Sequence, residues 1–263
     1  MLYSFAMFFY ILGFLLMFTH FFVNRRTLEK IANTSFALGV LCQAIFVSVN
    51  WSNGDTIYTS SLFGVLSLLM FFIILSYLII YVFYKRPFLS LLVAPLGIAS
   101  GVFGMLGTSI VHQKEYLSKF WIYIHLPLTI GGSAFFLLSA IVGVLYFIQE
   151  KQIKNKNFGL IFKNFPSLDT INKLNSSTII IGFVLFSGGV ISGIIWGVIE
   201  WGGRLILTPK LTFAFTTWVI FGIILLTKET MGMTPKKLAV WSIAGILLIL
   251  LTYHGVARFL MGN

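Results

Sequence analysis

Histidine and tryptophan are the residues of this sequence best suited to chemistry. The chain has four histidines, and a neutral imidazole is a common axial ligand of haem iron. Trp121 lies four residues before His125, and Arg258 four residues after His254, so each pair would share one helix face. An aromatic ring and a guanidinium suit the edge and the propionate of a porphyrin. This pattern predicts that His125 and His254 ligate haem iron beside Trp121 and Arg258.

The segment Trp196–Lys210, WGVIEWGGRLILTPK, has an unusual composition for a connector between apolar segments. Its large side chains would lie at a membrane interface or cover a flat ligand. Trp196 and Trp201 could form a stacking floor for haem, and Arg204 and Lys210 could contact propionates. An alternative stays open for all of these residues. Aromatic rings and cations gather at membrane interfaces in any helical membrane protein, and a histidine near a helix end commonly makes an ordinary hydrogen bond.

The composition predicts an all-α polytopic membrane protein. Of the 263 residues, 58% are hydrophobic and only 10% charged, with a mean hydropathy of +0.97. Soluble domains average about 25% charged residues. A single cysteine, Cys42, excludes an internal disulfide and a Cys-x-x-Cys motif. No motif of a hydrolytic enzyme occurs, and intramembrane charges that would line a transporter path are nearly lacking.

About eight apolar segments are long enough to cross a membrane as helices. We expect one integral membrane domain over residues 1–263, with four spans in residues 1–119 and the rest in residues 120–263. The predicted spans are 2–23, 31–49, 60–83, 88–110, 122–148, 177–199, 211–227 and 237–259. The longest connector should contain a break at Pro166, followed by a short surface helix capped by Ser167 or Asp169.

The distribution of Lys and Arg predicts the orientation of the spans. Alternate loops carry 13 of the 18 cations, and such loops stay on the cytoplasmic side. Both termini and the Trp196–Lys210 segment would then lie on the outer side of the cell membrane, together with His112, His125 and His254. His20 would lie toward the cytoplasmic end of the first span. The net charge of +11 therefore reflects topology, and no nucleic acid partner is expected.

Glycine spacing in the sixth predicted span indicates close helix packing. The glycines are Gly188, Gly189, Gly193 and Gly197. Small residues at such intervals let two helix backbones approach closely in a membrane.

Residues Ser192–Lys228 resemble the tryptophan-rich region of the cytochrome c assembly proteins, the haem-handling membrane proteins of the CcsA, CcmC and HemX type. Phe120–Lys154 resembles the fifth-span region of this family, and Phe165–Asn175 its HemX-like linker. The resemblance covers residues 120–263. The residues that fall on the tryptophan-rich pattern are Trp196, Trp201, Gly202, Pro209, Lys210, Thr212, Thr217 and Trp218.

The resemblance implies a haem-binding protein that presents non-covalent haem b at the outer membrane face, with His125 as an axial ligand. Haem delivery, rather than catalysis by the chain itself, is expected. The implied partners are haem, membrane lipids, a second assembly membrane protein and apocytochrome c. Central residues of the family pattern are replaced by Leu205, Leu207, Thr208 and Leu211. The alternative is therefore a HemX-like regulator or scaffold of tetrapyrrole synthesis that has lost haem binding.

Overall fold

The chain forms a helical membrane protein. Its computed structural model divides into two compact units, Met1–Glu115 and Tyr116–Asn263. Among the described residues, seven helices are long and apolar enough to cross a membrane. This confirms the predicted all-α polytopic class. That all spans form one bundle stays a prediction, and each unit is described by itself. The described residues are 1–52, 61–106, 119–156, 159–200 and 209–247.

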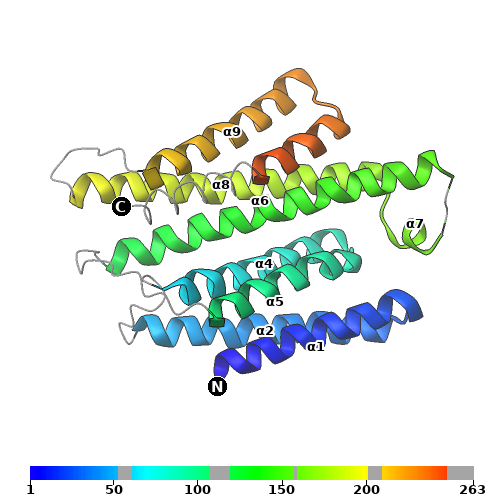
Figure 1. Ribbon diagram of the computed structural model, residues 1–263, viewed down its shortest axis with the longest axis horizontal. Coiled ribbons are helices and arrows are strands. Elements are labelled where there is room, and N and C mark those ends of the chain that lie inside the picture. Colours follow the sequence, from blue (N-terminus) through cyan, green and yellow to red (C-terminus); the bar gives the residue numbers. More distant parts are fainter. Residues whose placement is uncertain (53–60, 107–118, 157–158, 201–208, 248–263) are drawn as a thin grey trace. The chain divides into compact units, whose positions relative to one another are not determined.

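In the N-terminal unit, tight turns join the first helix to the second and end the third (Figure 1). The first turn is made by Asn24, which has a left-handed backbone (φ 52°) and donates its N–H to the His20 carbonyl at 2.7 Å. Lys85 ends the third helix in the same way (φ 51°). The elements are α1 Leu2–Val23, α2 Arg26–Ser52, α4 Leu62–Tyr84, the short 3₁₀ helix η1 Pro87–Leu89 and α5 Ser90–Leu106.

Buried polar side chains of α2 link it to α1 and α4. Gln43 is fully buried. Its amide oxygen accepts the Tyr10 hydroxyl at 2.8 Å, and its amide nitrogen donates to the Ser67 carbonyl at 2.6 Å. One end of α2 makes a similar link, because the Tyr77 hydroxyl donates to Asn33 at 2.7 Å. Because water is lacking in a bilayer core, these buried polar groups hydrogen-bond to one another and hold the three helices together.

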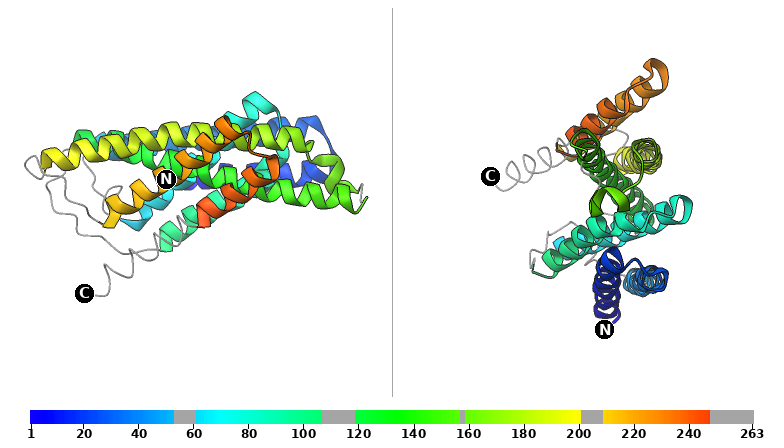
Figure 2. Two further views of the ribbon diagram at one scale, coloured as in Figure 1. Left: turned by 90° about the horizontal axis from the view of Figure 1, so that it is seen from above. Right: turned by 90° about the vertical axis from the view of Figure 1, so that its right-hand side faces the viewer.

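The C-terminal unit is built on two long helices that lie side by side in all three views (Figures 1 and 2). They are antiparallel, since Gly132 on one packs against Phe186 of the other, and Gly182 packs against Phe136. A Cβ at Gly132 would lie 2.7 Å from the Phe186 backbone nitrogen, so no larger residue fits there. The elements of this unit are α6 Lys119–Lys154, α7 Leu160–Asn164, α8 Leu168–Glu200, α9 Pro209–Met231 and a helix over residues 235–247.

Helix α9 packs on this pair through aromatic rings. Phe221 stacks on Phe136 with ring centroids 3.6 Å apart, and the Trp218 indole N–H donates to Ser187 Oγ at 2.7 Å. The helix over 235–247 packs on the same unit, where Ser242 Oγ donates to Asn175 Oδ1 of α8 at 3.0 Å. These contacts fix the register of four helices in the C-terminal unit.

Two sequence predictions need correction. The connector after the fifth span was expected to hold a separate surface helix, but Ser167 caps the long helix α8, with Thr170 N–H 3.3 Å from its Oγ. Helices α6 and α8 also extend well past the predicted limits, to 36 and 33 residues. At ~1.5 Å per residue they are longer than a ~30 Å hydrocarbon core, so we expect part of each helix to extend beyond the core. There the i,i+4 ion pairs Glu150–Lys154 and Asp169–Lys173 favour helix.

The eighth predicted span, 237–259, is helical over the described residues 235–247. Its remaining part lies outside the described residues. The predicted limits of the first span agree with those of α1.

Replacing Gln43 by Ala should destabilise the N-terminal unit, because two interhelical hydrogen bonds are lost at once. Such bonds contribute on average about 0.6 and at most about 1.7 kcal/mol each in membrane proteins. We expect the free energy of unfolding, measured by SDS titration, to fall by about 1–3 kcal/mol. Leu41→Ala is the control, since Leu41 on the same helix is 58% exposed. Equal effects of the two substitutions would contradict this role of Gln43.

Candidate functional site

His125 lies in the second turn of α6 and is held against α8. Its Nδ1 atom is 2.8 Å from the carbonyl oxygen of Gly189. The same oxygen accepts a hydrogen bond from Ser192 Oγ at 2.9 Å, and Ser192 Oγ is 3.4 Å from Nδ1. The imidazole of one helix is thereby tied to the backbone of the other.

The Gly189 carbonyl determines the tautomer that we assign to His125. A carbonyl oxygen only accepts hydrogen bonds, so the proton of the neutral imidazole must be on Nδ1. The lone pair is then on Nε2. Metal-ligating histidines commonly donate their other ring N–H to a carbonyl or carboxylate, which orients the ring and raises its basicity. His125 has this arrangement, because its Nδ1–H donates to the Gly189 carbonyl and its Nε2 keeps the lone pair.

Glycines on α8 make room for the His125 ring. A Cβ at Gly193 would lie 2.8 Å from Cε1 and 3.1 Å from Nδ1 of His125. A Cβ at Gly189 would lie 2.9 Å from the backbone nitrogen of Thr129, and Thr129 Oγ1 donates to the His125 carbonyl at 2.8 Å. The ring therefore lies against bare backbone, and its orientation depends on the absence of side chains at Gly189 and Gly193.

Trp196 lies on the same face of α8, one turn beyond Gly193. Its indole Nε1 is buried and has no hydrogen-bond partner among the described residues. A buried indole N–H normally finds an acceptor. An acceptor from a bound molecule, such as a carboxylate, would satisfy this donor.

The first turns of α6 and α9 and the last turn of α8 belong to the same end of the C-terminal unit, because neighbouring helices are antiparallel. The backbones of Trp121, in α6, and Lys210, in α9, therefore belong to the end that holds His125 and Trp196. The side chains of Trp121 and Lys210 are not described. The other predicted site residues lie outside the described residues: Trp201, Arg204, His254, Arg258 and also His112.

His20 belongs to the N-terminal unit and has partners that the sequence did not suggest. Its Nδ1 is 2.9 Å from the Arg25 carbonyl oxygen, and its Nε2 is 3.9 Å from Glu29 Oε2. Glu29 also accepts the Tyr81 hydroxyl at 2.8 Å. These contacts join the turn between α1 and α2 to α4.

Sequence reasoning missed the residues that hold His125. The spacing of Gly188, Gly189, Gly193 and Gly197 predicted close packing, and the structure confirms it for the first three. The sequence could not predict that these glycines pack against His125, because it does not show that α8 lies beside α6. Trp218, which falls on the family pattern, instead binds Ser187 and stacks on Phe183 with a 5.8 Å centroid separation.

The sequence is similar to proteins of cytochrome c assembly. The model of the family described as "Cytochrome C assembly protein" matches residues 1–262. The "Cytochrome c biogenesis protein CcsA" of Chlorella vulgaris is 25% identical over 256 residues, which cover 85% of this chain and 81% of that protein. The protein of the same name in Ranunculus macranthus is 26% identical over 251 residues, covering 82% and 79% of the two chains.

The resemblance seen in residues 120–263 thus extends to the N-terminal spans, since the family model matches almost the whole chain. The apolar helices show a multi-pass membrane protein. This chain belongs to the cytochrome c assembly protein family and has a role in cytochrome c assembly.

Proposed function

We propose that the protein binds haem b non-covalently and presents it for cytochrome c assembly, with Nε2 of His125 as an axial ligand of the iron. The hydrogen bond of 2.8 Å between His125 Nδ1 and the Gly189 carbonyl carries this proposal. It leaves the lone pair on the other ring nitrogen, as an iron ligand requires. Iron bound to the porphyrin needs only one or two further ligands, so a single oriented histidine can supply one axial ligand.

The remaining contacts of the haem would come from the same end of the C-terminal unit. The buried Trp196 N–H has no hydrogen-bond partner among the described residues, and a propionate oxygen would be an acceptor for it. We assign the second axial position to His254, with Arg258 beside it. The other proposed contacts are Trp121 and Trp201 as stacking rings, and Arg204 and Lys210 as propionate partners.

We infer that the His125 end faces the outer side of the cell membrane. The opposite end of the C-terminal unit holds most of its lysines, and loops rich in Lys and Arg stay in the cytoplasm. Two relatives carry the name "Cytochrome c biogenesis protein CcsA". By this similarity, haem would pass from the outer end to apocytochrome c, with a second assembly membrane protein as partner.

Replacing His125 by Ala should remove haem from the purified protein. The loss of an outer-shell partner alone costs 10–100-fold in metal affinity, so loss of the ligand should lower the haem content at least about tenfold. The haem content is measured by the pyridine haemochrome spectrum, and free imidazole should partly restore it. His20→Ala is the control, because His20 contacts Arg25 and Glu29. Unchanged haem content in His125→Ala would refute this ligand assignment.

Adding one methyl group at Gly193 should disturb the same ligand without removing it. The new Cβ would be 2.8 Å from His125 Cε1, so the ring or the helix must shift. We expect haem affinity to fall about 10-fold or more and the reduced α band to change. Gly222→Ala is the matched control, since its Cβ would lie 3.5 Å from Phe183, an ordinary contact. If both variants keep the wild-type spectrum, the α8 backbone does not position the ligand.

A second candidate function is regulation of tetrapyrrole synthesis without haem. The replacement of family residues by Leu205, Leu207, Thr208 and Leu211 favours it. In that case the basic connector between α6 and α8 would recruit a cytoplasmic protein.

Replacing Lys156 and Lys163 by Gln tests the regulatory role without cutting either long helix. Under this second function, the double variant should lose a partner that copurifies with the unaltered protein, while any haem signal stays the same. Retention of the partner by the double variant would exclude the connector as its binding site.

A further inference from the structure

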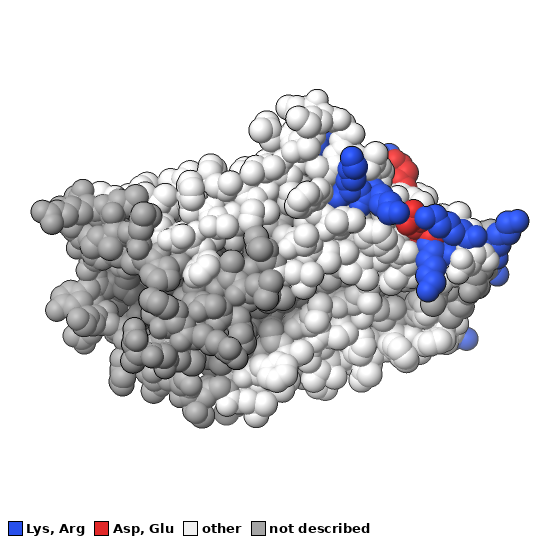
Figure 3. All heavy atoms as spheres, turned by 45° about the horizontal axis from the view of Figure 1, so that its top comes forward, with Lys and Arg blue, Asp and Glu red and all other residues white. Residues whose placement is uncertain are grey.

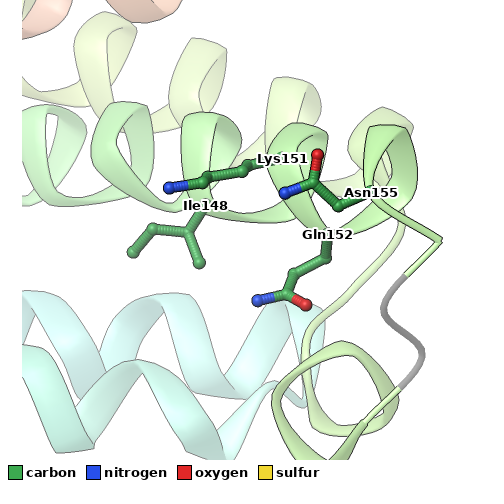
Figure 4. Close-up of a pocket in the computed structure, with 4 residues that line it drawn as sticks. All are labelled: Ile148, Lys151, Gln152 and Asn155. Atoms are coloured by element: carbon green, nitrogen blue, oxygen red, sulfur yellow. The ribbon is translucent and has the colours of Figure 1, made fainter.

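A hollow of about 310 Å³ lies at the C-terminal end of α6, away from the His125 end. It is lined by Ile148, Lys151, Gln152 and Asn155 (Figure 4). Figure 4 shows Ile148 and Gln152 projecting from the same side of α6, with Lys151 and Asn155 beside them. The hollow thus combines one apolar side chain, one cation and two amide groups.

This end of the C-terminal unit is strongly basic (Figure 3). Its lysines outnumber the described carboxylates, which are Glu150, Asp169 and Glu229. Each carboxylate is already in an ion pair with a lysine. The lysines are Lys151, Lys154, Lys156, Lys163, Lys173, Lys228, Lys236 and Lys237.

Lys151 is the cation of the hollow, and its charge is not neutralised by a described carboxylate. Its neighbour Lys154 pairs with Glu150 at 2.9 Å, but no described carboxylate lies within ion-pair distance of Lys151. The end of a helix carries only about half a negative charge. A full anion placed beside Lys151 and the amides of Gln152 and Asn155 would therefore meet a net attractive field.

Apolar side chains of α6 lie next to this hollow. Val144 is 45% exposed, and it lies one turn before Ile148 and two turns before Lys151 and Gln152. Residues at these spacings share one face of α6. An acyl chain could lie along Val144 and Ile148 while a headgroup reaches the polar residues.

We propose that this hollow binds the phosphodiester headgroup of an anionic phospholipid. Lys151 supplies the charge, and the side-chain amides of Gln152 and Asn155 donate to phosphate oxygens. Anionic lipids attract basic segments at membrane surfaces, and we expect a cation in contact with the headgroup to contribute about a fivefold change in affinity and more distant lysines less. The apolar face below the hollow favours a lipid over a free phosphate ion.

Native mass spectrometry of the full chain in mild detergent tests this site, with added dioleoyl phosphatidylglycerol as the probe. Lys151→Gln should lower the retention of this lipid about fivefold. Lys237→Gln is the matched control, because Lys237 is an exposed lysine at the same end that does not line the hollow. It should lower retention less than twofold. Dioleoyl phosphatidylcholine should be retained weakly by all three proteins.

Equal losses in Lys151→Gln and Lys237→Gln would overturn the proposal, because they would show diffuse attraction to the basic end. Displacement of the lipid by 10 mM inorganic phosphate (on the order of a cellular concentration) would also overturn it, since the site would then recognise the ion alone. The proposal would also be overturned if the unaltered protein did not retain phosphatidylglycerol.

Discussion

The contact between α6 and α8 is the interaction on which the proposed site depends. Two helices of 36 and 33 residues lie close along glycines, and the imidazole of His125 reaches the carbonyl of Gly189 at 2.8 Å. In a membrane the hydrophobic effect does not drive two helices together, so close packing and interhelical hydrogen bonds must do so. The histidine therefore both joins the helices and is oriented by them.

The C-terminal unit has different chemistry at its two ends. One end gathers the oriented histidine and a buried indole N–H without a described partner. The other gathers lysines and a small amphipathic hollow. The antiparallel order of the helices explains the separation, because successive turns alternate between the ends. A haem-presenting role and a lipid-anchoring role can therefore belong to one scaffold without competing for residues.

The sequence predicted the helical membrane class and His125 as a candidate, because both depend on composition and local spacing. Apolar length alone placed the spans. The sequence predicted a helix capped by Ser167 or Asp169, but not that this helix continues into the sixth span as α8, since the polar turns at its start look like a connector. It also could not pair His125 with Gly189, or Trp218 with Ser187, because these contacts join residues 64 and 31 positions apart. Such pairs require the register between helices.

The absorption spectrum of the purified protein in mild detergent, oxidised and then reduced, is the most direct test of haem binding at His125. We expect a Soret band and, on reduction, sharp α and β bands typical of imidazole-ligated haem. A featureless spectrum that persists after haem is added back would contradict it, because an oriented His125 would then have no iron to bind.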